Sequence, residues 1–161
     1  WLIELEQPKR VESVANAQQK LDAGDIDGAL RELKPLRNWL ADYWKMWALL
    51  SSAYNRAGMH AEAEESSRRL IEMFPGCEPA YGEYREALNG QGRHEEAYQV
   101  MQNVAMGNPQ SLSIHINLAI AAHRAGQSEQ AKALAASIRE AVKENQDWLN
   151  EVNNLFAEID C

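Results

Sequence analysis

Four glycines that stand 34 residues apart constrain the fold of this chain more than any other feature of its sequence. Each of them is followed after five residues by an alanine; the pairs are Gly24 and Ala29, Gly58 and Ala63, Gly92 and Ala97, and Gly126 and Ala131. The chain holds only nine glycines, so a spacing shared by four of them indicates a repeated structural unit. A period between about 20 and 50 residues is typical of stacked repeats.

Other positions recur with the same period and predict that each unit is a pair of helices. Long apolar residues recur at Leu36, Leu70, Val104 and Ile138, ring-bearing residues at Trp47, Tyr81 and His115, and prolines at Pro75 and Pro109. In each unit, apolar residues fall at helical spacing over two stretches of about 12 to 14 residues. The glycine would supply a left-handed turn between the two helices, and the proline would end the second one. The alanine is small enough to let the helices pack closely.

This pattern resembles the tetratricopeptide repeat, a 34-residue helix–turn–helix unit. Residues 44–77 carry the family's preferred residues at eight positions: Trp47, Leu50, Ser51, Tyr54, Gly58, Ala63, Leu70 and Pro75. We therefore expect Trp47 in the core. For Trp44, a surface contact and a packing role are both compatible with the pattern.

The other units depart from the family pattern to different degrees. Arg85 stands where a small residue is usual, and Lys143 stands at the proline position. The first unit departs most, with Ser13 at the aromatic position and Pro35 within the second helix. We expect Pro35 to kink or shorten that helix.

The resemblance implies an all-α fold, a right-handed superhelical solenoid of helix–turn–helix repeats. The expected parts are an N-terminal segment at 1–9, four repeats at 10–43, 44–77, 78–111 and 112–145, and a C-terminal capping helix at 146–161. The first segment, which begins at Trp1, would be the tail of an upstream element that Pro8 cuts off. In the last helix, one apolar stripe would cover the end of the stack; it consists of Leu149, Val152, Phe156 and Ile159.

In this family, the first helices of successive repeats line a concave groove that usually holds a segment of a partner protein. The groove positions of this chain are Lys45, Leu49, Ser52, Asn55, Arg56, Glu83, Glu86, Asn89, Asn117, Ile120 and Arg124, together with Ile116 and His123. The Lys and Asn clamp that holds acidic chaperone tails in some members is absent, because Val14, Gln18 and Leu49 stand at its positions. We expect charge reversal at both Glu83 and Glu86 to impair partner binding and to leave the helical content unchanged.

The charge of the chain argues against two classes of partner. Its net charge is -8, from 16 basic and 24 acidic residues, whereas binding to a phosphate backbone needs clustered Lys and Arg. No apolar stretch approaches the ~20 residues needed to span a bilayer, so we expect neither nucleic-acid binding nor membrane insertion. The acidic excess is concentrated in residues 78–111 and 146–161. It is either a solvated face or a field that steers a basic partner.

The two ends and the two cysteines bear on where the protein resides. The chain begins with Trp1 rather than Met and shows no basic segment before an apolar core, so we expect a piece of a longer cytoplasmic protein. A periplasmic location stays open. Cys77 and Cys161 are too few for a disulfide framework, and we expect two unpaired thiols whose role is open.

No catalytic motif, cofactor site or metal site is expected within these residues. His60 and His94 stand at equivalent positions of neighbouring repeats, about 10 Å or more apart, which is too far for ligands of one ion. A run of carboxylates is expected on a solvent-exposed helix surface rather than as an acid–base pair; it consists of Glu62, Glu64 and Glu65.

Three functional classes remain open. The first, which we favour, is a module that binds a protein or peptide partner, either as a free adaptor or within a larger chain. The second is a non-catalytic domain of an enzyme whose chemistry lies outside these residues. The third is a bacterial secretion or assembly chaperone, a class that this chain resembles in size, acidity and number of repeats. Partner identity and assembly into a homo-oligomer stay open.

Overall fold

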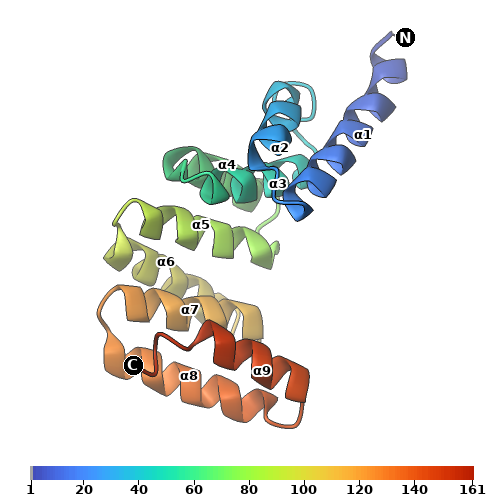
Figure 1. Ribbon diagram of the computed structural model, residues 1–161. Helices are drawn as coiled ribbons and strands as arrows, with labels where there is room; N and C mark the ends of the chain where they lie inside the picture. The colour runs from blue at the N-terminus through green and yellow to red at the C-terminus, as the bar shows by residue number, and fades with distance from the viewer. Residues whose placement is uncertain (1) are drawn as a thin grey trace. The chain divides into compact units, whose positions relative to one another are not determined.

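The computed structural model describes residues 2–161, with side chains from Gln7 onward. Trp1, expected in an N-terminal segment, lies outside the described residues. The part that is described consists of α-helices, one 3-10 turn and their connections, with no strand among them (Figure 1). None of its helices is both long and apolar enough to cross a membrane. The predicted all-α fold is confirmed.

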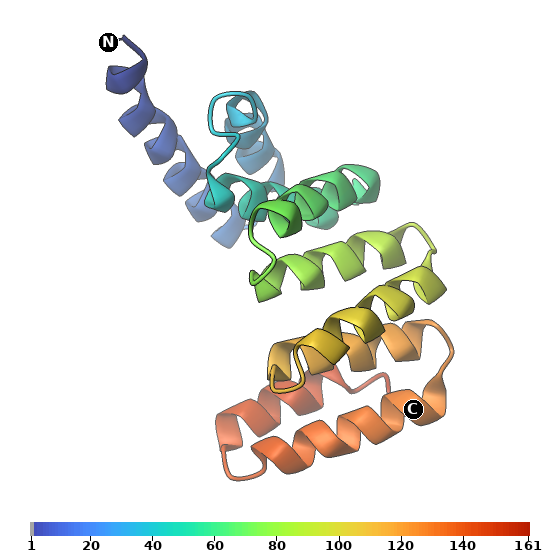
Figure 2. The ribbon, with the colours of Figure 1, turned by 180° about the vertical axis from the view of Figure 1, so that it is seen from behind.

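The chain divides into two compact units, up to Gly90 and from Gln91 onward, and each is described by itself. The first unit contains α1 (Leu2–Asp22), α2 (Ile26–Leu33), the 3-10 turn η1 (Lys34–Leu36), α3 (Trp44–Arg56), α4 (His60–Met73) and α5 (Glu78–Gly90). The second contains α6 (His94–Gly107), α7 (Leu112–Arg124), α8 (Ser128–Val142) and α9 (Gln146–Leu155). Figure 2 shows the same helices from behind.

In the first unit, each helix packs against the next one along the chain, and α3 also contacts α1 and α5. Leu33, Met46, Leu50 and Leu70 are buried at the centre of this packing. Ala63, one of the periodic alanines, has no exposed surface. A larger side chain there would hold α4 away from its neighbours, so the alanine period reflects close contact between helices.

In the second unit, α6 packs on α7, α7 on α8 and α8 on α9. Ile114 of α7 and Val152 of α9 are fully buried. The capping helix predicted at 146–161 is shorter in the structure, because α9 ends at Leu155. Phe156 and Ile159 are buried in the turns that follow α9, and Leu149 is half-buried.

Arg139 of α8 forms hydrogen bonds that hold residues 156–160, which follow α9, against α8. Arg139 donates through Nη1 and Nη2 to the two carboxylate oxygens of Asp160, at 3.1 and 2.7 Å. Its Nε donates to the side-chain oxygen of Asn153 at 2.8 Å. The guanidinium also lies 5.7 Å from the centroid of the Phe156 ring. These contacts explain why the chain folds back after α9 instead of continuing the helix.

All four periodic glycines stand at bends between helices, as predicted. Their φ angles are +82° at Gly24, +74° at Gly58, +74° at Gly92 and +77° at Gly126. At Gly58, for example, the amide of Met59 donates to the carbonyl of Tyr54 at 2.8 Å, which is the bond pattern of a left-handed helix end. A residue with a side chain is strained at positive φ, so each of these bends requires a glycine. The 34-residue spacing of the glycines is therefore the spacing of the bends.

The two prolines of the first hairpin behave differently. Pro35 is the second residue of η1, which begins at Lys34 directly after α2 ends at Leu33, and the expected shortening of the second helix is confirmed. Pro8, in contrast, lies inside α1, so the break expected there does not occur. Proline removes one backbone hydrogen bond and can bend a helix without ending it. Val14, Ala17 and Leu21, which lie farther along α1, are buried and hold the helix against its neighbours.

Candidate functional site

A hollow of about 510 Å³ lies between α1 and α3, on the side formed by the first helix of each of the first two hairpins. Helix α1 contributes Val11, Val14, Ala15, Gln18 and Gln19. The start of α3 contributes Tyr43, Trp44, Lys45, Ala48 and Leu49. The lining is therefore apolar with a few amides and a single formal charge, that of Lys45.

The sequence of α3 explains why this surface stays open. One stripe of the helix, including Met46, Leu50 and Ala53, is buried against α2, α4 and α5. The next stripe, which includes Ala48, Leu49 and Ser52, is only half-buried and turns toward the hollow or beside it. An amphipathic helix whose apolar stripe is wider than its buried contact leaves such a surface for a ligand.

Two tryptophans one turn apart serve different purposes. Trp47 is 9% exposed and its indole N–H donates to the carbonyl of Ala41 at 2.8 Å, so its assignment to the core is confirmed. Trp44 is 42% exposed and forms a wall of the hollow. The ammonium of Lys45 lies 5.9 Å from the centroid of the Trp44 ring.

Three predicted groove residues form hydrogen bonds between helices of the first unit. Asn55 donates through Nδ2 to the side chain of Glu83 at 2.7 Å and to the Glu83 carbonyl at 2.9 Å. Arg56 donates to the carbonyl of Leu21, at the end of α1, at 2.9 Å. Asn55 thereby links α3 to α5, and Arg56 links α3 to α1. These side chains support the packing of the unit, which the sequence did not reveal.

The remaining predicted groove residues of the first unit lie on α3 and α5. Ser52 and Asn89 are half-buried, and Glu86 is exposed. Glu86 accepts a hydrogen bond from Arg85 at 3.2 Å. None of the three lines the hollow between α1 and α3.

The predicted groove residues of the second unit all lie on α7. Asn117 donates to the carbonyl of Ser113 at 2.9 Å, and Arg124 forms an ion pair with Glu158 at 3.2 Å. Ile120 and His123 are half-buried, and Ile116 is buried.

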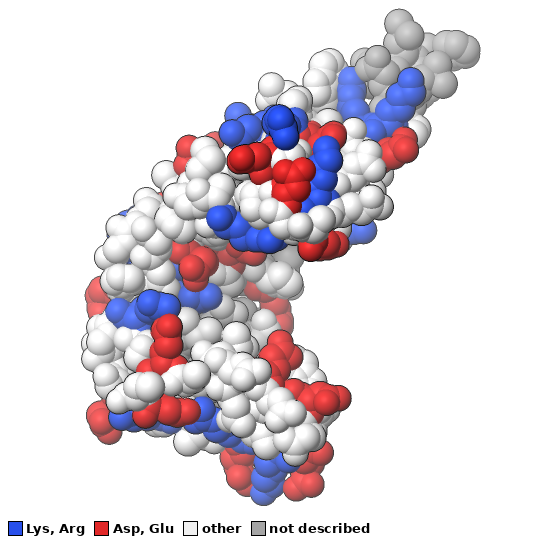
Figure 3. Space-filling model, in the orientation of Figure 1, with Lys and Arg blue, Asp and Glu red and all other residues white. Residues whose placement is uncertain are grey.

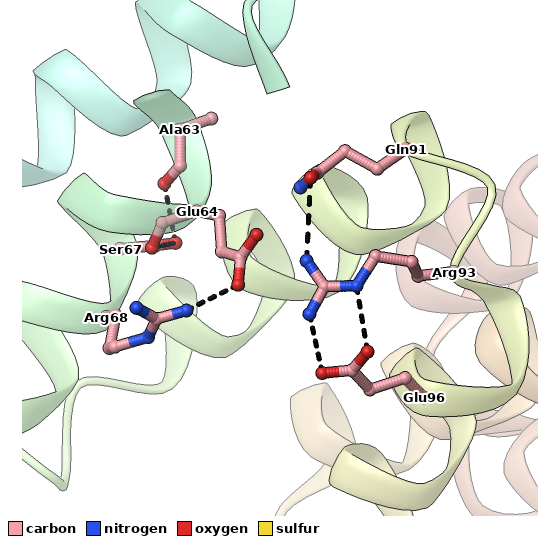
Figure 4. Close-up of polar contacts among 7 residues, drawn as sticks. All are labelled: Ala63, Glu64, Ser67, Arg68, Gln91, Arg93 and Glu96. Carbon is pink, nitrogen blue, oxygen red and sulfur yellow. Dashed lines mark hydrogen bonds and ion pairs between the residues drawn. The ribbon is translucent and has the colours of Figure 1, made fainter. Parts of the chain in front are cut away.

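The carboxylates Glu62, Glu64 and Glu65 of α4 were predicted to be solvent-exposed, and this prediction is wrong for Glu64. Glu65 is exposed and Glu62 is half-buried, but Glu64 is 7% exposed. Glu64 faces the packed side of α4 and forms an ion pair with Arg68 one turn later (Figure 4). The charge of Arg68 makes burial of this carboxylate tolerable.

Many other charged side chains of the described residues pair with a neighbour of opposite charge or lie among side chains of both signs. In the second unit, Arg93 donates hydrogen bonds to both carboxylate oxygens of Glu96, at 2.7 and 2.8 Å (Figure 4). On the face drawn in Figure 3, acidic and basic side chains lie among one another. Burial raises the pKa of Tyr54 and of Tyr81 above 10.0, so both phenols stay protonated at neutral pH.

The contribution of α1 to the site was largely missed from the sequence. Val14 and Gln18 were recognised as first-helix positions, but Val11, Ala15 and Gln19 were not. Their signal was present, because all five positions fall on one face of a helix at spacings of three or four residues. The expected break at Pro8 and the weak match of residues 10–43 obscured it.

Comparison with known proteins agrees with this architecture. Residues 88–150 match the sequence model of a tetratricopeptide repeat family. The fold matches that of a thermophilic tetratricopeptide-repeat protein from Thermus thermophilus, with a TM-score of 0.67 and 18% identity over 93% of this chain and 89% of that one. Residues 88–150 therefore carry tetratricopeptide repeats, and the chain shares its fold with solved tetratricopeptide-repeat proteins. No curated protein matches its sequence.

Two further solved structures share the fold of this chain. MamA from Desulfovibrio magneticus RS-1 has a TM-score of 0.68 and 16% identity, over 94% of this chain and 86% of that chain. A mutant O-GlcNAc transferase from Thermobaculum terrenum has a TM-score of 0.71 and 17% identity, over 84% of this chain but only 26% of that chain. At these identities the comparison concerns the fold alone.

Proposed function

We propose that this tetratricopeptide-repeat chain binds a segment of a partner protein in the hollow between α1 and α3. The observation that carries the proposal is an open hollow of about 510 Å³, bordered by the exposed ring of Trp44 and lined by apolar and amide side chains. Concave, largely apolar surfaces with a few polar groups are the usual form of binding sites. Exposed tryptophan is enriched among the residues that dominate protein–protein binding energy.

The polar groups of the hollow suit a protein backbone. Gln18 and Gln19 present amides that both donate and accept hydrogen bonds. Such groups satisfy the peptide N–H and C=O of an incoming segment, while the exposed Val11 and the half-buried Leu49 contact its apolar side chains. Tetratricopeptide repeats are in general protein-interaction modules, which agrees with this proposal.

The proposal is tested by one substitution and a matched control. Ala15 and Ala136 are both exposed helical alanines, but only Ala15 lines the hollow. Ala15→Arg fills the hollow with a long charged side chain, and Ala136→Arg makes the same change on α8. With the chain as bait, we expect Ala15→Arg to lose its captured partner and Ala136→Arg to retain it. Equal capture by both variants would show that the partner binds elsewhere.

A second candidate is that these repeats form the non-catalytic part of a larger enzyme. The observation that favours it is the fold match to the O-GlcNAc transferase, in which the matched region is 26% of the chain. The sequence of the full gene tests it, since a catalytic domain next to these residues is required. This candidate is compatible with partner binding in the hollow.

A further inference from the structure

Trp44 forms a wall of two hollows. Besides the hollow between α1 and α3, it borders a second one of about 460 Å³ at the connection from α4 to α5. That second hollow is completed by Met73, Phe74, Pro75, Gly76 and Cys77. Phe74 is 45% exposed and Trp44 is 42% exposed, so two large aromatic rings are partly exposed to solvent where the two hollows meet, a place called the junction below.

The charge at this junction is unlike that of the chain as a whole. The net charge of the protein is -8, yet no carboxylate lines either hollow, and Lys45 supplies the one formal charge among their lining residues. Its ammonium lies 5.9 Å from the centroid of the Trp44 ring. A lone cation beside apolar walls is complementary to an apolar ligand that carries a negative group.

We propose that the partner segment crosses Trp44, with one large apolar side chain in each hollow and a carboxylate against Lys45. This inference rests on the proposed function and specifies the chemistry of its partner. An occupant of one hollow covers only part of the Trp44 ring, whereas an occupant of both removes more of it from water. Each square ångström of apolar surface buried contributes about 25 cal/mol, so the straddling segment is favoured.

A second copy of this chain fits the junction less well than a separate partner segment does. Two copies would each bring a net charge of -8, and their mutual repulsion opposes association. A short apolar segment with one carboxylate brings one negative charge instead of eight, so it meets much less repulsion and still pairs with Lys45.

The first test selects 12-residue peptides from a phage-displayed random library on the full chain. We expect the enriched peptides to share two large apolar residues and an Asp or Glu. We also expect Lys45→Glu to select Lys or Arg at the position of that acid. Failure to enrich any peptide, or enrichment without the apolar pair, would overturn the proposal.

The second test compares two exposed tryptophans. Trp44→Ala is expected to weaken binding of an enriched peptide at least tenfold. Trp148→Ala removes a ring that is 44% exposed on α9, and is expected to leave binding unchanged. Phe74→Ser, at an exposed position of the second hollow, gives a variant that tests the junction even if Trp44→Ala folds poorly. Unchanged binding by Phe74→Ser would contradict the proposal.

The third test uses Cys77 as a reporter inside the second hollow. Cys161→Ser leaves Cys77 as the only thiol, since the chain has two cysteines. A saturating enriched peptide is expected to slow alkylation of Cys77 by N-ethylmaleimide at least fivefold. If Ala15→Arg abolishes the binding of a peptide that leaves the alkylation rate of Cys77 unchanged, that result would overturn the straddling segment but leave the proposed function intact.

Two further outcomes are distinguishable. Peptides that bind equally to wild type, Ala15→Arg and Trp44→Ala would overturn both the straddling segment and the proposed function. A concentration-dependent dimer in analytical ultracentrifugation, dissociated by Trp44→Ala, would show that a second copy covers the junction and would overturn the proposed occupant.

Discussion

At the scale of single residues, backbone conformation and hydrogen bonding decide which side chains are replaceable. The periodic glycines have positive φ, a property that only the local chain determines. Asn55 and Glu83, in contrast, matter because α3 and α5 place them within hydrogen-bond distance. Both kinds of residue are polar or small, so composition does not separate them.

Gly58→Ala is expected to lower the free energy of unfolding by about 1–2 kcal/mol, because an L-residue is strained at a φ of +74°. Gly76→Ala is the matched control. No atom lies within 4 Å of a Cβ added there, and its φ lies outside the left-handed region. We expect it to change the free energy of unfolding by less than about 0.5 kcal/mol. Urea denaturation of both variants measures the difference, and equal effects would contradict the assigned bend.

The two acidic groove residues of α5 are expected to differ when their charge is reversed. Glu83→Lys removes the carboxylate that accepts from Asn55, leaving only the Glu83 carbonyl as acceptor, and is expected to cost about 1–2 kcal/mol of unfolding free energy. Glu86→Lys changes an exposed side chain and is expected to change the unfolding free energy by less than about 0.5 kcal/mol. The expectation that both reversals spare the fold is therefore revised at Glu83. Thermal unfolding followed by circular dichroism tests this, and equal midpoints for the two variants would refute it.

At the scale of the element, a helix is defined by what covers its ends and faces. Ser111 caps α7 by accepting from the amide of Ile114 at 3.2 Å, and Asn145 caps α9 by accepting from the amide of Trp148 at 3.1 Å. Such caps are local and mark the helix starts in the sequence. The end of α9 is not local, because Arg139 of α8 holds the chain that follows it.

Arg139→Ala is expected to loosen the end of α9 and the turns after it. The bonds to Asp160 and Asn153 are partly exposed to solvent, so we expect a loss of about 1 kcal/mol. Amide hydrogen exchange should accelerate in residues 152–160. Lys143→Ala breaks an exposed ion pair between Glu140 and the residue that directly follows α8, and serves as control. Equal protection in both variants would show that Arg139 does not fasten the tail.

At the scale of the whole molecule, charge and apolar surface have separate roles. The chain carries a net charge of -8, which favours solubility, while the two hollows beside Trp44 contain one charge, that of Lys45. Binding at the hollows should therefore depend on apolar contact more than on long-range attraction.

We expect the association rate of an enriched peptide to change by less than about threefold between 50 and 500 mM salt. The Debye length falls from about 14 Å to about 4 Å over this range, so a steered encounter would slow markedly. Stopped-flow measurements at both concentrations decide the matter. A tenfold or greater fall in rate would show that attraction between opposite charges steers the encounter, and would contradict this expectation.

The sequence by itself determined the helix pairs, their bends and the shortened helix before Pro35. These features depend on φ preferences and on apolar spacing, which act between residues close together in the chain. The tertiary structure decided that Glu64 is buried, that Asn55 and Glu83 bond to each other, and that Trp44 borders two hollows. Those outcomes require helices distant in sequence to pack side by side, and no local pattern specifies which polar groups then face one another.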